Sequence, residues 1–187
     1  MPATSHRQGV PQIVAAIQTA VGGVKLPDGR WGSVAPNLTP AFERVELFDS
    51  EQIVEAFRYL IITEQRVCVI VPMDEQFETI TEKQKLLSRR MLQVMLLISD
   101  RVHGSRKAAL WGDDVTPGAL NLMELVLPAI TGLVLPNPDG VIAEPVSSSV
   151  LSVGDTEKDL PSRVTVGLEF HCRGGYLQAG LPAGAIW

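Results

Sequence analysis

The sequence predicts an α+β domain of two layers, in which helices pack on one face of a mainly antiparallel sheet of about four strands. Three observations lead to this prediction. The chain has 187 residues, 45% of them hydrophobic, which is enough for one buried core without disulfides or metals. Hydrophobic residues recur at helical spacing in some segments and form strand-like runs in others. The strand-like runs follow one another closely enough to pair as antiparallel neighbours.

The first two expected helices each carry an apolar stripe and a recognisable end. Residues 9–21 have hydrophobic side chains at the 3, 4, 7 spacing, with two glycines after the last turn. A second helix covers about residues 50–61. Asp49 and Gln52 have the spacing of a capping box at its start.

A third helix is expected to begin at Pro117, with Asp114 or Thr116 as its cap. Its buried stripe ends near Leu133. Pro128 lies inside this segment and cannot donate to the carbonyl of the preceding turn, so we expect a kink or fraying there.

The strands are predicted from alternation and from β-branched runs. The run VCVIV is continuous and apolar, which is typical of a central strand covered on both faces. Helical spacing also fits residues 89–99, but valine, isoleucine and the polar alternation favour a long strand. The expected strands cover residues 42–48, 67–71, 89–99, 141–153 and 163–172.

Three segments lack these patterns. Residues 25–40 are rich in proline and glycine and are expected to form a loop, with Trp31 packed locally. Residues 73–85 are polar and irregular, so we expect a projecting, mobile loop. Residues 174–187 have no charged side chain, and they include four glycines, which disfavour helix and strand. We therefore expect a single domain, 1–173, followed by a C-terminal arm, 174–187.

Composition excludes several functional classes. Acidic side chains outnumber basic ones by 21 to 16, unlike a protein that binds nucleic acid through phosphates. No apolar run approaches the roughly 20 residues of a membrane span, and the first residues lack the apolar core of a secretory signal. Two cysteines make neither a disulfide scaffold nor a four-ligand zinc site, and we expect a reducing compartment.

No catalytic motif of a nucleotide-binding, hydrolase or metalloprotease type occurs in the sequence. His171 and Cys172 are adjacent on an expected strand, so their side chains point to opposite faces and cannot act together. Asp113 and Asp114 could hold a divalent cation, but a helix start is the simpler role. We therefore expect no enzymatic activity, no catalytic residue, no metal and no cofactor.

The later part of the chain carries a sequence of motifs in a distinctive order. GALNLME (118–124) and ITGLVLP (130–136) are followed by Pro145–Val146 and then by SRVTVGLEF (162–170). This order resembles the tail terminator proteins of tailed bacteriophages, the Mu-like subgroup in particular. The strands at CVIVP (68–72) and 89–98 fall where that family places its own, and the resemblance covers roughly residues 42–173.

The resemblance implies a structural virion protein. It implies a homohexameric ring that caps the head-proximal end of the tail tube, stops tail polymerisation and joins the head–tail connector protein. In contractile tails the ring also caps the sheath protein. It implies location in the virion, at the neck, after assembly in the host cytoplasm. DNA would pass through the lumen without specific binding, which suits an acidic ring.

Two other interpretations remain open. One is another neck, head-completion or connector protein, which would differ in stoichiometry and in the end of the tail that it binds. The other is a small-molecule-binding or enzymatic α+β domain, which would need a deep apolar pocket with perturbed titratable groups.

Two sets of residues are the expected partner-binding sites. The projecting loop would present Glu75, Glu78 and Glu82 to the tube or the lumen. The arm contains Tyr176, Leu181 and Trp187, and an uncharged aromatic segment left in water is unfavourable. We expect the arm to dock on a neighbouring molecule with Trp187 as its anchor, although folding back on its own domain would also bury it.

Overall fold

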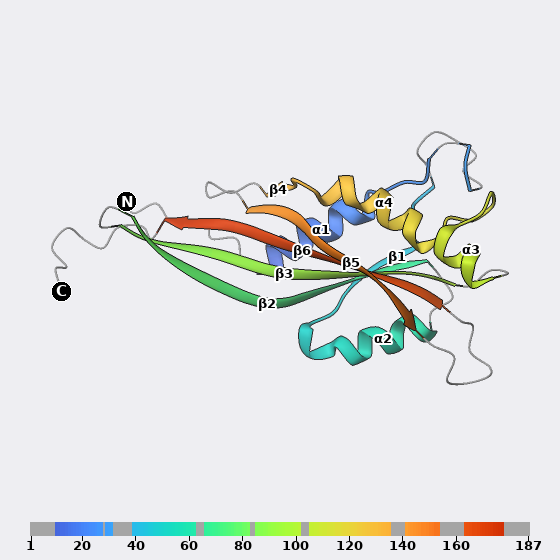
Figure 1. Ribbon diagram of the computed structural model, residues 1–187, viewed down its shortest axis with the longest axis horizontal. Coiled ribbons are helices and arrows are strands. Elements are labelled where there is room, and N and C mark those ends of the chain that lie inside the picture. Colours follow the sequence, from blue (N-terminus) through green and yellow to red (C-terminus); the bar gives the residue numbers. More distant parts are fainter. Residues whose placement is uncertain are drawn as a thin grey trace.

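A six-stranded sheet forms the centre of the protein, with the strand order β1-β2-β3-β6-β5-β4 (Figure 1). The computed structural model describes residues 10–27, 29–31, 39–62, 66–82, 85–101, 105–135, 141–153 and 163–177. β1 (Arg44–Leu47) is parallel to β2, and all other neighbouring strands are antiparallel. The predicted α+β class and the mainly antiparallel sheet are therefore confirmed.

α1 (Val10–Gly22) and α4 (Ala119–Ile130) lie on the same face of the sheet (Figure 1). Their hydrophobic stripes pack against even-numbered residues of the two central strands, β3 and β6. These residues belong to the main core. α4 includes Pro128 and continues to Ile130, so the helix does not end at the proline. α3 (Arg106–Trp111), which the sequence analysis missed, packs on this face beside the start of α4.

α2 (Ile53–Ile62) lies on the opposite face, so the expectation that all helices share one face is wrong (Figure 1). Its Ala56 and Leu60 pack against Val67, Val69 and Val71, while the alternate residues of the same run face the main core. A strand that is apolar on both sides needs cover on both sides. A short 3-10 helix, η1 (Ser50–Gln52), precedes α2 at the predicted capping box.

The segment 73–85 is not a loop. β2 (Val67–Glu82) and β3 (Lys85–Arg101) form one long hairpin that pairs residue by residue to Glu82 and Lys85. A bulge between Pro72 and Glu75 shifts the register. Because of this shift, polar and apolar side chains do not alternate regularly along the segment, so the sequence pattern does not indicate a strand. Hydrogen bonds between the two strands of the hairpin hold the segment in the sheet instead.

The last strand is also longer than expected. β6 (Arg163–Leu177) continues through Gly174 and Gly175, because residues 174–177 pair with residues 87–90 of β3. These four residues were expected to belong to the arm and not to a strand. Residues 178–187 lie outside the described part of the chain.

β5 (Val141–Val153) has the predicted bounds and pairs with β6 along its length. β3 pairs with β6 rather than with β5, so β6 lies between β3 and β5 in the sheet. On its other side, β5 pairs at Val141 and Ile142 with the two-residue β4 (Val134–Leu135), which was not predicted, and at Ala143 with Gly132 and Leu133. None of the described helices is long and apolar enough to cross a membrane.

Candidate functional site

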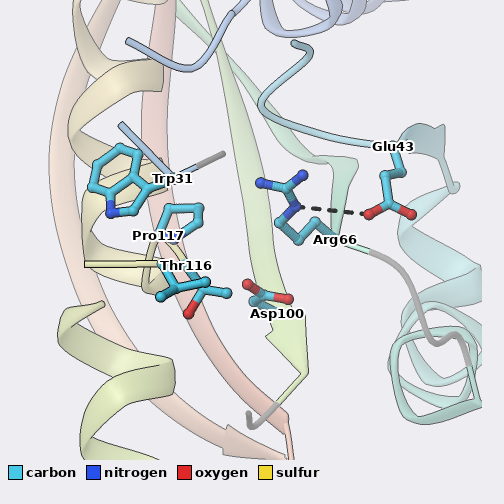
Figure 2. Close-up of a pocket in the computed structure, with 7 residues that line it drawn as sticks. Trp31, Glu43, Arg66, Asp100, Thr116 and Pro117 are labelled. Atoms are coloured by element: carbon cyan, nitrogen blue, oxygen red, sulfur yellow. Dashed lines mark ion pairs between the residues drawn. The ribbon is translucent and has the colours of Figure 1, made fainter. Parts of the chain in front are cut away.

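A cleft of about 270 Å³ opens at the end of the sheet where β3 finishes (Figure 2). Three parts of the chain form it: the loop that carries Trp31, the loop before α4, and the sheet end with Arg66 and Asp100. The described residues that line it are Trp31, Glu43, Arg66, Asp100, Val115, Thr116 and Pro117.

Trp31 forms one wall and is held from two directions. Its Nε1 donates a hydrogen bond of 2.9 Å to the carbonyl oxygen of Asp113, and the Arg30 guanidinium lies 4.8 Å from the ring centre. Its side chain belongs to the main core. Its φ of 52° is in the left-handed region, which is rare for a bulky residue, and such strain persists only where surrounding contacts enforce it. Trp31 is therefore packed, but against a segment 82 residues away rather than locally in its own loop, and it lines the cleft, so the expectation of purely local packing is wrong.

The loop before α4 forms the rim of the same wall. Asp113 Oδ1 accepts hydrogen bonds from the Val115 and Thr116 amides at 2.8 and 2.7 Å, and from Thr116 Oγ1 at 3.1 Å. Asp113 therefore closes a turn ahead of the helix. The N-cap of α4 is Gly118 and not Asp114 or Thr116, as the sequence analysis proposed.

Charged side chains form the opposite wall and the floor. Figure 2 shows Arg66 turned across the opening from Trp31, with its Nε 3.7 Å from Glu43 Oε1. The Arg66 side chain is 19% exposed. Asp100 is 3% exposed, and its Oδ1 accepts a hydrogen bond from the Arg101 amide at 2.7 Å. The cleft thus presents a guanidinium and two carboxylates beside an aromatic ring.

A second buried polar cluster lies on the other face of the sheet from Asp100. Arg163 is 2% exposed; its Nε donates to Ser99 Oγ at 3.0 Å, and Thr165 Oγ1 lies 3.0 Å from the same oxygen. Burial lowers the pKa of Arg163, and the nearby Asp100 carboxylate opposes that effect. These contacts tie β3 to β6 at this end of the sheet.

Two further reactive groups, the Cys68 thiol and the Ser147–Glu169–His171 cluster, do not line the cleft. Burial raises the pKa of the Cys68 thiol well above its ordinary value, which makes it a buried hydrophobe rather than a nucleophile. On the exposed face of β6, His171 Nε2 lies 3.1 Å from Glu169 Oε1, and Ser147 Oγ donates to Glu169 Oε2 at 3.0 Å. Because the carboxylate stands between serine and histidine, the histidine cannot act as base for the serine.

The described residues contain no group of three or more histidine, cysteine or acidic side chains placed to hold a metal ion. His171 and Cys172 lie on opposite faces of β6, as the sequence predicts: Cys172 belongs to the main core, whereas His171 shares the other face with Glu169.

The expected partner-binding residues do not line the cleft. Glu75 is half-buried on β2, Glu78 and Glu82 lie on the strand nearer the hairpin turn, and Tyr176 lies on β6. Leu181 and Trp187 fall outside the described residues. The register brings the backbones of Tyr176 and Glu78 to one end of the sheet, because Tyr176 is paired with Ser88 and Ser88 with Thr79.

No protein-family model and no curated protein matches the chain. Among solved structures, it is similar to a chain from the virion of a native gene transfer agent particle. The TM-score is 0.36 and the sequence identity 11%, over 58% of this chain and 69% of the other. A likeness of this size leaves the function to be argued from the chain itself.

Proposed function

We propose that the protein is a structural component of a phage-type virion and acts as a tail terminator, assembling with copies of itself into a ring that caps the tail tube. The observation that carries the proposal is the position of the motifs that resemble that family. GALNLME opens α4, ITGLVLP ends it, Pro145–Val146 lies in β5, and SRVTVGLEF forms most of β6. α4 packs on β6, and β5 pairs with it, so the four motifs form one continuous half of the fold.

The open edge of β5 supports association between copies. Among the described residues, its outer edge is paired with β4 at Val141 and Ile142, and Ala143 donates to the Leu133 carbonyl oxygen and accepts from the Gly132 amide. Pro145 and the bulge that follows it interrupt the edge, but residues 147–153 contain neither proline nor a charged side chain. Native proteins usually protect free edges with such residues. Val150 is 55% exposed in the middle of this unprotected stretch.

The two edges of the sheet are not equivalent. At the other edge, Gln18 Nε2 of α1 donates to the carbonyl oxygen of Val45 at 3.0 Å and occupies one outward-facing group of β1. An interface that uses β5 on one copy and a different surface on the next is heterologous. Heterologous contacts close into rings when the rotation between copies allows it.

The long hairpin supports binding to a tube. β2, β3 and β6 extend past α1 and α4 at one end of the molecule (Figure 1). The strands at this end carry Glu78, Glu82 and Tyr176, which we retain as candidate contacts with tail tube, sheath or connector proteins. Strand ends that project beyond their helical cover offer backbone and side chains to a partner.

The experiment is to measure the mass of the full chain by light scattering and to image it with purified tail tubes by negative-stain microscopy. The proposal predicts a multi-subunit ring, either free or on the head-proximal end of the tube. Val150→Lys should weaken ring formation, because it places a charge on the open edge. Val54→Lys is the matched control, since Val54 is 54% exposed on α2. A single-subunit mass at every concentration, together with bare tubes, would contradict the proposal.

The same images separate the alternative neck role. A head-completion or connector protein would bind capsids or portals instead of tubes. The cleft beside Trp31 is the feature of the described residues that favours a small-molecule-binding domain. The two described groups with shifted pKa values, Cys68 and Arg163, do not line it.

A further inference from the structure

We infer that the cleft between Trp31 and Arg66 binds an extended uncharged peptide, and that this peptide is residues 178–187 of a neighbouring copy. The inference rests on the proposed self-assembly and adds the segment and the cleft through which copies are joined.

The lining of the cleft suits a neutral ligand that both donates and accepts hydrogen bonds. Arg66 offers guanidinium N–H groups on one side, and Glu43, whose side chain is 44% exposed, offers carboxylate oxygens (Figure 2). A free anion would meet Glu43 and Asp100, and a free cation would meet Arg66, so either ion faces a like charge. A peptide group is neutral and supplies a C=O for arginine and an N–H for a carboxylate.

The remaining lining is apolar and supplies a place for a side chain. Trp31 and Pro117 lie on the same side of the opening, across from Arg66 (Figure 2), and Val115, which also lines the cleft, is 72% exposed. Covering the exposed Val115 side chain would remove apolar surface from water, which is favourable. The occupant should therefore be a peptide with hydrophobic or aromatic side chains.

Residues 178–187 (QAGLPAGAIW) have this composition. They contain no charged side chain, and they include Leu181, Ile186 and Trp187. Other uncharged runs of ten or more residues occur at 8–24, 31–42, 125–138 and 145–154. The runs at 8–24, 125–138 and 145–154 belong largely to α1, to α4 with β4, and to β5, and the run at 31–42 includes Trp31, which is itself a wall of the cleft.

The segment of the same copy cannot reach the cleft. Val164 of β6 pairs with Asp100 at the cleft, and the described strand ends 13 residues later at Leu177. At about 3.3 Å per residue, this separation is about 43 Å. Ten residues span at most about 36 Å when fully extended. The occupant must therefore come from another copy, and each copy would offer its cleft to one neighbour and its segment to the other.

The test is a disulfide cross-link between two differently labelled full-length proteins. One carries Val115→Cys at the rim of the cleft, and the other carries Ala185→Cys in the segment. The native Cys68 and Cys172 are buried and do not compete in the folded protein. Mild oxidation of the mixture should give a covalent pair of unlike chains. The control replaces Val115→Cys with Val54→Cys, which is exposed on α2 at the opposite face.

Adding Arg66→Gln to the Val115→Cys protein should lower the cross-linking rate about tenfold, because a charge-assisted hydrogen bond to the peptide is lost. Arg58→Gln, on the exposed surface of α2, should leave the rate unchanged. Equal rates for the Val115 and Val54 partners would overturn the inference. If the copies still form a ring in that case, the inference fails and the proposed function stands. If light scattering shows a single subunit throughout, both fail.

Discussion

Trp31 Nε1 and the Asp113 carbonyl oxygen are joined by a hydrogen bond of 2.9 Å between segments 82 residues apart in the chain. The bond closes one wall of the cleft and fixes the loop before α4 to the loop after α1. Because the donor is an indole in a side chain that is 8% exposed, water has little access to replace it. The strained backbone of Trp31 therefore depends on this contact.

We predict that Trp31→Phe lowers the free energy of unfolding by about 1–3 kcal/mol, because the part-buried hydrogen bond to the Asp113 carbonyl is lost and the smaller ring fills less of the core. Chemical denaturation at neutral pH measures the change. Trp111→Phe is the matched control: Trp111 is 62% exposed, and its replacement should change stability by less than about 0.5 kcal/mol. Equal effects of the two substitutions would show that the indole hydrogen bond does not stabilise the fold.

The sequence predicts best those elements whose pattern is complete within the element. The bounds of β5 match the prediction, and α1 differs by one residue at each end, because their flanking residues mark both ends. The hairpin ends of β2 and β3 were missed because the bulge after Pro72 changes the alternation, and because pairing of the two ends with each other, rather than an apolar pattern, makes them strands. Gly174 and Gly175 oppose strand formation locally, but pairing with Arg89 and Arg90 overrides that preference.

The cleft could not be predicted in the same way. Trp31, Arg66 and Asp100 have no common spacing in the sequence, and each is unremarkable in its own segment. The parallel β1–β2 pair and the antiparallel β2–β3 pair bring Glu43, Arg66 and Asp100 together at one end of the sheet. The strand pairing, which no local pattern specifies, is what creates the site.

Arg163 provides a second prediction about stability. Its guanidinium is buried, and it donates to both Ser99 Oγ and, at 3.4 Å, the Ser99 carbonyl oxygen. Arg163→Met keeps most of the packing but removes these bonds and the charge beside Asp100, so unfolding should become easier by about 2–4 kcal/mol.

Arg173→Met is the matched control, measured by the same denaturation experiment. Arg173 and Glu144 are 3.5 Å apart, and their side chains are about half exposed. Loss of an exposed pair should cost at most about 1 kcal/mol. The assignment of Arg163 as a stabilising cation is wrong if its replacement is no more harmful than that of Arg173.

Cys68 predicts a dependence of stability on alkaline pH. Burial raises the pKa of its thiol in the folded protein, whereas the unfolded thiol ionises near pH 8.5. Above that pH the unfolded chain binds fewer protons than the folded one, so the free energy of unfolding falls by up to about 1.4 kcal/mol per pH unit. Below about pH 8 the thiol makes no pH-dependent contribution.

Cys68→Val should remove this slope while leaving other titrating groups in place. Urea denaturation at pH 7, 8.5 and 10, under reducing conditions, compares the two proteins. We expect the difference in stability between variant and parent to shift in favour of the variant as the pH rises. A difference that stays constant from pH 7 to pH 10 would mean that the thiol ionises equally in both states.

Gly118 gives the sharpest prediction from backbone geometry. A Cβ atom at this position would lie 2.5 Å from the Leu110 carbonyl oxygen and closer still to the Gly112 amide nitrogen, and neither backbone atom can move without displacing α3 from α4. Gly118→Ala should therefore lower the free energy of unfolding by about 3 kcal/mol or more, as overpacking against a fixed backbone does. It should also open the loop that carries Asp113.

Gly22→Ala is the matched control, because a Cβ there meets nothing within 4 Å and the residue closes α1. Alanine is the better helix former, so this variant should be as stable as the parent or more stable by up to about 1 kcal/mol. Thermal denaturation of both variants measures the contrast. If Gly118→Ala melts at the same temperature as Gly22→Ala, the close approach of the α3 and α4 backbones does not exist in solution. The glycine that opens GALNLME would then have no steric reason to be glycine.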